Sequence, residues 1–234
     1  MDNQVYNQIV NFIWGIADDC LRDVYVPGKY RDVILPMTVI RRLDVMLEKT
    51  KSAVLIMKNK LDDAKIDNQW PALCNTAGQA FCNASPFLLK DLTSRAKKQS
   101  LKTDFIVYLD GFSPNVQLIL DKFKFRNQID TMVDADILGA VIEKFTSSDI
   151  NLSPNPIYKD DAKTILVHPG LDNHGMGTIF EELIRRFNEE NNEEAGEHWT
   201  PRDVVELMAD LVFIPIQDKI KDATYSCYDG ACGT

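Results

Sequence analysis

Apolar residues recur every three or four positions along most of the 234-residue sequence, and this spacing is the strongest constraint on its fold. Such a period places the apolar side chains on one face of an α-helix, whereas a strand would need strict alternation. Two long stripes near the N-terminus consist of Val5, Ile9, Phe12, Ile13, Ile16 and Cys20, and of Val33, Ile34, Met37, Ile40, Val45 and Leu47. Pro27-Gly28 separates them, and Pro36 marks a kink or a new start within the second. The sequence therefore predicts a mainly α chain.

Three pairs of a hydroxyl residue and a proline predict further helix starts. A serine or threonine side chain can cap free backbone N–H groups, and proline at the first helical position loses no hydrogen bond. These pairs are Ser85-Pro86, Ser113-Pro114 and Thr200-Pro201, and each precedes an apolar-periodic run. One continuous helix is predicted over residues 127–145. A last clean stripe consists of Ile179, Phe180, Leu183, Ile184 and Phe187.

The composition of the sequence changes between the helices predicted at 127–145 and 179–187. Residues 146–163 are polar and contain two prolines, which favours a domain boundary near residue 160. We therefore expect a helical N-terminal domain over residues 1–160 and a second domain over residues 161–234. In the second part, only ATYSCYD at residues 223–229 is typical of a strand.

The net charge of −9 disfavours general binding to a phosphate backbone, because affinity for DNA comes largely from lysine and arginine. Two basic segments are exceptions, RAKKQSLK at 95–102 and KFKFR at 122–126. The second alternates basic residues with phenylalanine, a pattern that could grip a single strand. Because Phe123 continues the helical spacing of the preceding apolar residues, a core-facing ring with water-facing lysines is the favoured interpretation.

The remaining ionisable side chains show no pattern of a metal site or a disulfide framework. The five cysteines include no C-x-x-C pair and the three histidines have no ligand spacing, so we expect scattered thiols and no metal. Reduced thiols and the lack of a secretory signal favour a cytoplasmic protein. No segment approaches the roughly 20 apolar residues of a membrane helix. Arg41 and Arg42 are expected to be ion-paired surface residues.

Three short motifs are candidates for a ligand site. NPIY at 155–158 resembles the N-P-P-Y segment with which amino-group methyltransferases hold a flipped base. Isoleucine replaces the second proline and no strand precedes it, so a proline turn is favoured. HGMG at 174–177 lacks the third glycine of a dinucleotide loop and is interpreted as a turn into a helix starting near Thr178. DGACGT at 229–234 is the strongest candidate, because small residues after a strand let a ligand approach the backbone closely.

The context of DGACGT carries a resemblance to a known family. GEHWTPRDVVELMADLV at 196–212, followed by YDGACGT, resembles the S-adenosylmethionine site of N6-adenine DNA methyltransferases. The chain is most similar to the modification (M) subunit of type I restriction–modification enzymes. This likeness includes FIWGIADDCLRDVYVPGKYRDVILPMTVIRRLD, YLDGFSPNVQLILDKFKF and DNHGMGTIFEELIRRFNEENNEEAGEHWTPRDVVELMADLVF, and so extends over nearly the whole chain.

The resemblance implies a cofactor site made of two segments. The T-P segment supplies Glu197, His198, Trp199, Thr200, Pro201 and Arg202, and the loop supplies Asp229, Ala231, Cys232, Gly233 and Thr234, with Gly230 where the family commonly has proline. Thr200 would help mainly by its position at the helix start. Trp199 would offer a flat apolar wall to the cofactor, with a core tryptophan as the alternative. Neither a catalytic residue nor a metal ligand is expected in the chain.

The resemblance also implies a fold, an activity and partners. The helical domain would be followed by the helical lead-in and first strand of a Rossmann-like (α/β) methyltransferase domain. The complete protein would transfer methyl from S-adenosyl-L-methionine to adenine N6 in double-stranded DNA, together with a specificity (S) subunit, a second M subunit and a restriction (R) subunit. The family's catalytic D/N-P-P-Y/F segment follows the glycine loop and would fall beyond Thr234, so we expect these residues alone to be inactive.

Two other functions stay open on the residues alone. The amphipathic helices would suit an assembly module that binds a specificity subunit without catalysis of its own. The glycine loop could also serve a different Rossmann enzyme that binds NAD or ATP. A ribose-binding acid and an N-P-P-F/Y segment further along the gene would favour the methyltransferase.

Overall fold

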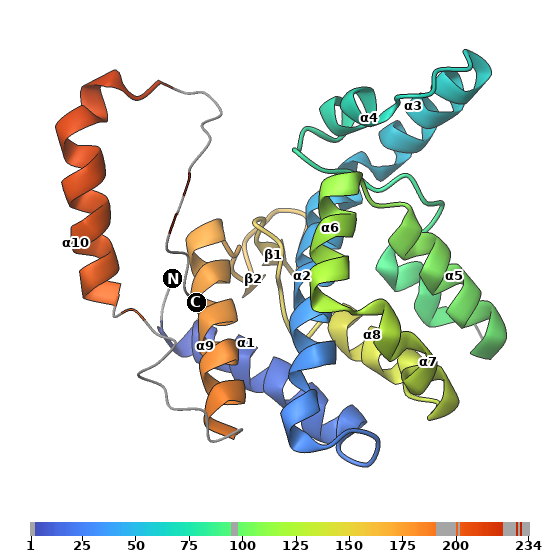
Figure 1. Ribbon diagram of the computed structural model, residues 1–234, viewed down its shortest axis with the longest axis horizontal. Coiled ribbons are helices and arrows are strands. Elements are labelled where there is room, and N and C mark those ends of the chain that lie inside the picture. The colour runs from blue at the N-terminus through green and yellow to red at the C-terminus, as the bar shows by residue number, and fades with distance from the viewer. Residues whose placement is uncertain are drawn as a thin grey trace. The chain divides into compact units, whose positions relative to one another are not determined.

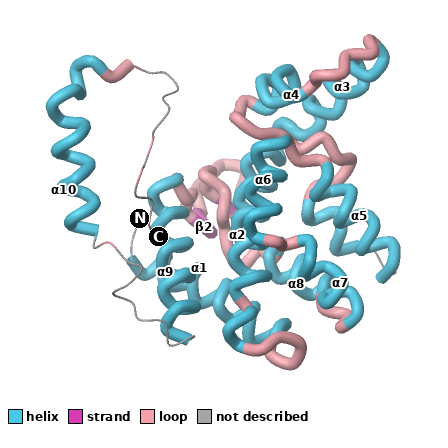
Figure 2. Tube along the Cα trace, viewed as in Figure 1, coloured by secondary structure: helices cyan, strands magenta, loops and turns pink. Residues whose placement is uncertain are grey.

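A computed structural model describes residues 3–94, 98–190, 200, 202–221, 228 and 230 of the chain. Its helices and strands are α1 (Asn3–Ile16), α2 (Arg31–Leu47), α3 (Lys51–Asp63), α4 (Trp70–Ala77), α5 (Lys98–Asp110), α6 (Pro114–Phe123), α7 (Arg126–Asp134), α8 (Leu138–Thr146), β1 (Ile157–Tyr158), β2 (Leu166–His168), α9 (Asn173–Glu190) and α10 (Arg202–Phe213). Helices dominate Figures 1 and 2, so the prediction of a mainly α chain is confirmed. None of the described helices combines the length and apolar character needed to cross a bilayer.

The chain forms two compact units, residues 1–187 and residues 188–234. In the first unit, residues far apart in sequence share one apolar core, and Ile13, Ile34, Phe105, Val141 and Leu183 are each completely buried there. Fully burying a side chain of this size stabilises a fold by about 1.5–3 kcal/mol. The core therefore holds helices from α1 to α9 in a single body.

The predicted apolar stripes form the inner faces of the helices. Ile9, Ile13 and Ile16 of α1 are at most 6% exposed, and Ile179 and Leu183 of α9 are fully buried. The second predicted stripe is buried throughout α2. Pro36 lies inside this helix, which continues through it. Of the kink and the new helix start predicted for that proline, the new start is therefore excluded.

In the basic segment at 122–126, the rings face the core and the lysines face water, which is the interpretation that the sequence favoured. Phe125 is fully buried, Phe123 is partly buried against the core, and Lys122 and Lys124 are exposed. Arg126 forms an ion pair with Asp110 at 2.7 Å. The two rings therefore contribute to the fold, and neither is presented for stacking on a nucleic acid base.

The single helix predicted over 127–145 is wrong, because α7 and α8 are separate helices. The chain between them turns at Asp136, whose φ is +62°. The Asp136 N–H donates to the Val133 carbonyl at 3.1 Å, and the Ile137 N–H donates to the Met132 carbonyl at 2.9 Å. Such a pair of hydrogen bonds ends a helix at a residue in the left-handed conformation, which is usually glycine. Apolar spacing continued across the turn because both helices face the same core.

Of the three helix starts predicted from a hydroxyl residue and proline, one is wrong. A 3-10 helix begins at Leu89, three residues after Pro86, and the buried Ser85 hydroxyl accepts from Lys51 instead of capping a helix. Helix α6 does begin at Pro114, although the Ser113 hydroxyl accepts from the Cys82 N–H and caps nothing. Helix α10 begins at Arg202, directly after the third pair.

A short antiparallel hairpin follows α8 and was not predicted. Ile157 of β1 pairs with His168 of β2, and the Asp160 carboxylate holds the turn by accepting from the Thr164 and Ile165 N–H groups. Strands of two and three residues are too short to show alternation, which explains the omission. The strand predicted at 223–229 lies, except for Tyr228, outside the described residues.

Helix α9 also begins earlier than predicted. It starts at Asn173 rather than near Thr178, so HGMG lies in its first turns. The first compact unit consequently reaches Phe187, well past residue 160. A domain boundary at residue 160 stays a prediction, because compact packing alone does not define where a domain ends.

We expect the substitution Gly78→Ala to lower the free energy of unfolding by about 1 kcal/mol. Gly78 ends α4 with φ of +66°, a conformation that strains any residue with a Cβ. The matched control is Gly15→Ala inside α1, where a Cβ meets nothing within 4 Å, and it should raise the free energy by up to about 1 kcal/mol. Denaturant unfolding of both variants checks the opposite signs, and changes of the same sign would contradict the assignment.

Candidate functional site

The residues of the two candidate cofactor segments lie mostly outside the described part of the chain. Thr200 is described and exposed, and α10 begins two residues later at Arg202. Gly230 lies in a turn, where a Cβ would come within 3.2 Å of the Tyr228 ring. The candidates outside the described residues are Glu197, His198, Trp199, Pro201, Asp229, Ala231, Cys232, Gly233 and Thr234. Their convergence into one pocket therefore stays a prediction.

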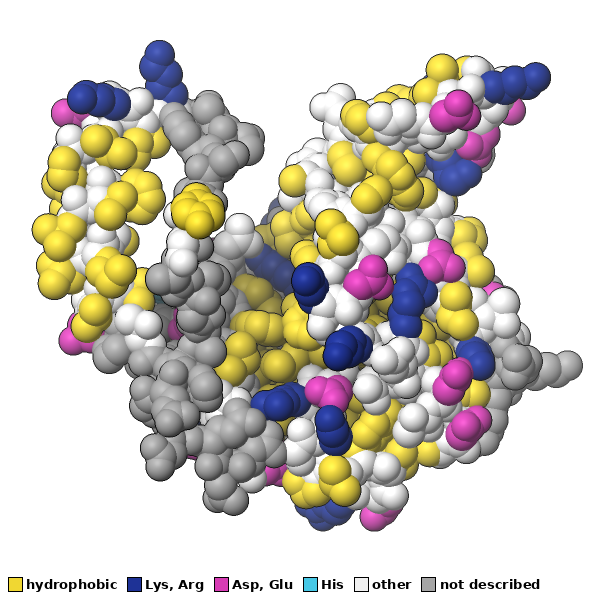
Figure 3. All heavy atoms as spheres, viewed as in Figure 1, with side chains coloured by type: hydrophobic (Ala, Val, Ile, Leu, Met, Phe, Trp, Pro, Cys, Tyr) yellow, Lys and Arg dark blue, Asp and Glu magenta, His cyan; other side chains and the backbone are white. Residues whose placement is uncertain are grey.

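Helix α10 begins at the end of the first of these segments and carries an exposed apolar stripe. Val204, Val205, Leu207, Met208, Leu211 and Val212 are 41% to 68% exposed. Figure 3 shows hydrophobic side chains along this helix. Residues at this spacing form one face, which globular proteins normally cover. No described residue of the second unit buries this face.

In the first unit, Arg42 of α2 forms a polar centre that sequence reasoning missed. The residue is 6% exposed, and its Nη1 donates to the Leu152 carbonyl at 2.6 Å and to the Leu171 carbonyl at 2.7 Å. Its Nη2 donates to Asn173 Oδ1 at 3.0 Å. Burial lowers the pKa of Arg42, while the charge of Asp172 raises it. The interpretation of Arg42 as a surface residue in an ion pair is wrong.

Helix α9 also contacts α1, which it crosses in the view of Figure 1. The rings of Trp14 and Phe187 have centroids 4.8 Å apart, and Arg186 lies over the Trp14 ring while donating to Asn11 Oδ1 at 2.8 Å. At the other end of α9, Gly175 allows close approach to α1, because a Cβ there would lie 3.0 Å from the Tyr6 ring. The contacts run along the helix and fix its direction.

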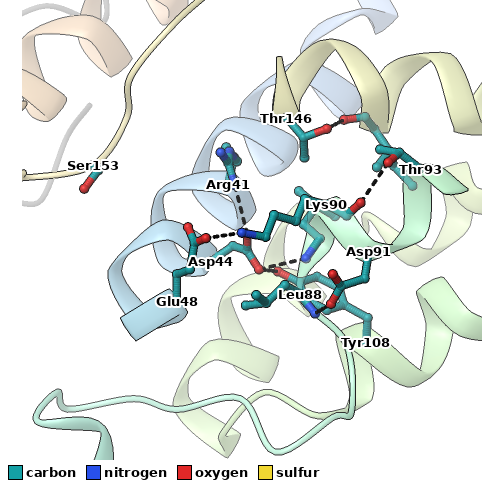
Figure 4. A network of polar contacts seen from close by, with 12 residues as sticks. Arg41, Asp44, Glu48, Leu88, Lys90, Asp91, Thr93, Tyr108, Thr146 and Ser153 are labelled. Carbon is teal, nitrogen blue, oxygen red and sulfur yellow. Dashed lines mark hydrogen bonds and ion pairs between the residues drawn. The ribbon is translucent and has the colours of Figure 1, made fainter. Parts of the chain in front are cut away.

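A second polar centre lies between α2, α5 and the 3-10 helix Leu89–Ser94 (Figure 4). The buried Asp44 accepts from Arg41 at 3.0 Å, from the Leu89 N–H at 2.9 Å and from the Tyr108 hydroxyl at 3.0 Å. Burial raises the pKa of Asp44, and the Leu89 N–H and Arg41 oppose that shift. Arg41 is thus ion-paired, as predicted, but with a buried partner.

Lys51 is the third buried polar side chain of this kind. Its Nζ donates to the Asn83 carbonyl at 3.1 Å, to Asn83 Oδ1 at 3.0 Å and to Ser85 Oγ at 3.3 Å. Gly111 closes the cluster from the other side, since a Cβ there would lie 2.5 Å from Ser85. Burial lowers the pKa of Lys51 to about 8. Because every donor has an acceptor and no space remains, the cluster stabilises the fold rather than binding a ligand.

Three further observations on the described residues bear on ligand binding. None of their buried side-chain nitrogen or oxygen atoms lacks a hydrogen-bond partner. They contain no group of three or more histidine, cysteine, aspartate or glutamate side chains able to hold a metal ion. A hollow of about 20 Å³ between α5, α7 and α8, lined by Leu101, Met132 and Gly139 among others, has room for about one water molecule. This hollow is too small for an organic ligand.

Comparisons with known proteins place these features in a family. Residues 9–145 match the family model described as the HsdM N-terminal domain, which covers more than half of the chain. The chain belongs to the family of M subunits of type I restriction–modification enzymes. Residues 171–234 of this M subunit match the N-6 DNA Methylase family, which makes it a methyltransferase subunit. Neither the curated proteins nor the solved structures contain a match.

The Arg42 cluster joins the two matched regions of this M subunit directly. Arg42 belongs to the HsdM N-terminal region, whereas Leu171 and Asn173 open the methylase region. The contacts of Trp14 with Phe187 and of Asn11 with Arg186 join the same two regions. Helix α9 thus belongs to the methylase region by sequence and to the helical body by packing.

We expect the substitution Arg42→Met to lower the free energy of unfolding by about 2–4 kcal/mol, because it leaves the Leu152 and Leu171 carbonyls buried without a donor. Amide hydrogen exchange at residues 171–176 should be faster in this variant than in the wild type. Arg22→Met is the matched control, since it removes an exposed pair with Asp18 and should change stability by at most about 0.5 kcal/mol. Equal effects of the two substitutions would contradict the role of Arg42.

We expect Lys51 to make stability rise with pH. Its pKa of about 8 lies below the ordinary lysine value of 10.5, so between these pH values the unfolded chain binds more protons than the folded one. The quantity to compare is the free energy of unfolding of the wild type minus that of Lys51→Met. This difference should increase between pH 8 and pH 10.5, by on the order of 1–3 kcal/mol. Denaturant unfolding at several pH values measures this difference. A flat or falling difference would contradict the buried ammonium group, and the exposed-site variant Lys60→Met controls for losing one positive charge.

Proposed function

We propose that the complete protein transfers a methyl group from S-adenosyl-L-methionine to the N6 amino group of adenine in double-stranded DNA. The match to the N-6 DNA Methylase family over residues 171–234 supports this most, because it includes both segments of the candidate cofactor site. The segment 197–202 would line the cofactor, and the loop 229–234 would enclose its methionine end. The cofactor supplies an activated methyl group when bound.

The residue types of the two segments fit such a ligand. Trp199 offers a flat apolar surface for an adenine ring or a methionine chain, and Asp229 can accept from a hydroxyl or an ammonium group. The small residues between Gly230 and Thr234 let the ligand approach the backbone. Adenine N6 is a weak nucleophile, since its lone pair is shared with the ring. The protein would therefore contribute mainly by flipping the base and orienting it in line with the methyl group.

We also propose that other chains supply what these residues lack. With a net charge of −9, this M subunit is poorly suited to hold DNA by itself, which supports target recognition by a specificity (S) subunit. A second M subunit and a restriction (R) subunit would complete the assembly. Residues 1–234 contain no N-P-P-Y/F segment, and NPIY lies partly in strand β1 of the first unit. We therefore propose that residues 1–234 do not methylate DNA alone.

We expect the complete M subunit, mixed with its S subunit, to incorporate labelled methyl from S-adenosyl-L-methionine into DNA as N6-methyladenine. The substitution Asp229→Asn should weaken binding of the cofactor about 10- to 100-fold, because it removes a charged acceptor. Asp218→Asn is the matched control, since Asp218 is exposed in the same unit and lies outside both segments. Calorimetry measures both affinities, and chromatography of digested DNA identifies the product.

Other results would overturn the proposal in distinct ways. Tight binding of NAD or ATP without binding of S-adenosyl-L-methionine would favour a different nucleotide enzyme. Full binding of the S subunit with no methyl transfer by the complete protein would favour a pure assembly module. Methyl transfer by residues 1–234 alone would contradict the proposal that a further segment is required.

A further inference from the structure

Cys74 and Cys82 lie together in the first unit, although the sequence predicts scattered thiols. Their sulfur atoms are 3.5 Å apart, and both thiols are free. Cys74 belongs to α4, and Cys82 lies in the segment that follows it. The pair escaped sequence reasoning because seven residues separate the two cysteines, without the C-x-x-C spacing of redox motifs.

The local fold brings the two sulfurs together. Gly78 ends α4 in a left-handed conformation, and the Gln79 N–H donates to the Cys74 carbonyl at 3.3 Å, so the chain turns back along the helix. The Cys82 backbone is held by Ser113, because its N–H donates to Ser113 Oγ at 3.2 Å and its carbonyl accepts from the Ser113 N–H at 3.0 Å. Cys82 is therefore anchored where α6 begins.

The two thiols differ in their access to solvent. Cys82 is fully buried, whereas Cys74 is partly exposed. Burial, with Cys74 as the next cause, raises the pKa of Cys82 to about 12, so Cys82 stays protonated. A soluble oxidant can thus reach Cys74 first, and the product would lie beside an unreacted thiol. Among the described residues, Cys20 has no second sulfur at this distance.

We propose that Cys74 and Cys82 form a redox-active dithiol site that a hydroperoxide oxidises to an intrachain disulfide. The Cys74 sulfur, as its thiolate, attacks one peroxide oxygen. The O–O bond breaks, the departing oxygen takes up the proton that the Cys74 thiol released and leaves as water, and Cys74 becomes a sulfenic acid. The Cys82 sulfur then attacks the Cys74 sulfur, the S–O bond breaks, and the second water leaves with the Cys82 proton. Two thiols lose two electrons and the peroxide gains them, so the step needs no other reagent.

The geometry requires only a small movement. A disulfide has a sulfur–sulfur distance of about 2.05 Å, so the two atoms must approach by roughly 1.5 Å, within the reach of side-chain rotation. The bond would join α4 to the segment anchored on α6. Helices α3 and α4 lie side by side at one end of the body, beyond α6 (Figure 2). Oxidation would therefore fasten this pair of helices to the rest of the unit.

The experiment treats the complete, folded protein with hydrogen peroxide, alkylates the remaining thiols after denaturation, and digests the chain with trypsin. Residues 66–90 form one tryptic peptide that contains both cysteines and no internal lysine or arginine. We expect this peptide to lose two hydrogen atoms and to carry no alkyl group. We also expect amide hydrogen exchange in α4 to slow after oxidation and to recover on reduction with dithiothreitol.

Two variants separate the roles of the cysteines. Cys82→Ala should accumulate a sulfenic acid at Cys74, which dimedone traps and mass spectrometry locates. Cys74→Ala should give no dimedone adduct at Cys82, and circular dichroism confirms that each variant is folded. The proposal fails if the wild-type peptide keeps two alkyl groups at peroxide concentrations that fully oxidise glutathione. It also fails if Cys74 becomes sulfinic acid without a disulfide.

Discussion

The buried guanidinium of Arg42 is the interaction on which the arrangement of the M subunit's two regions most depends. A cation that cannot lose its proton is tolerated in an apolar interior only when its donors are satisfied. Carbonyls from the segments at Leu152 and Leu171, with the Asn173 side chain, provide this satisfaction. Both segments are thereby fixed on α2, and the start of α9 is fixed with them. The methylase region consequently begins as a part of the helical body.

The rest of the body is organised around similarly satisfied polar groups within an apolar core. Asp44 and Lys51 each have several partners, and helices distant in sequence share the surrounding apolar residues. A core filled in this way transmits strain between its helices. We infer that the body serves to position the methylase region. The methyl-transfer chemistry is proposed for the segments around Thr200 and Asp229.

Much of the fold could be predicted from particular residues. The stripes that begin at Val5, Val33 and Ile179 predicted three helices, because apolar periodicity reflects a local geometry. The break between α7 and α8 could not be predicted, since Asp136 adopts the left-handed conformation without a glycine. Lys65 and Lys124 end helices in the same conformation. Of the site, the sequence alone provides the identity of the residues, and their convergence stays a prediction.

The sequence by itself determined the helical class, the inward faces of the helices and the family, because each depends on residues close together in the chain. Only the tertiary structure decided the surroundings of Arg42, Lys51, Cys74 and Cys82. Each of these side chains takes its protonation state, its partners or its reactivity from groups brought to it by folding. Arginine at position 42 could have formed a surface pair with a neighbour on its own helix. It is buried because segments more than 100 residues away supply its acceptors.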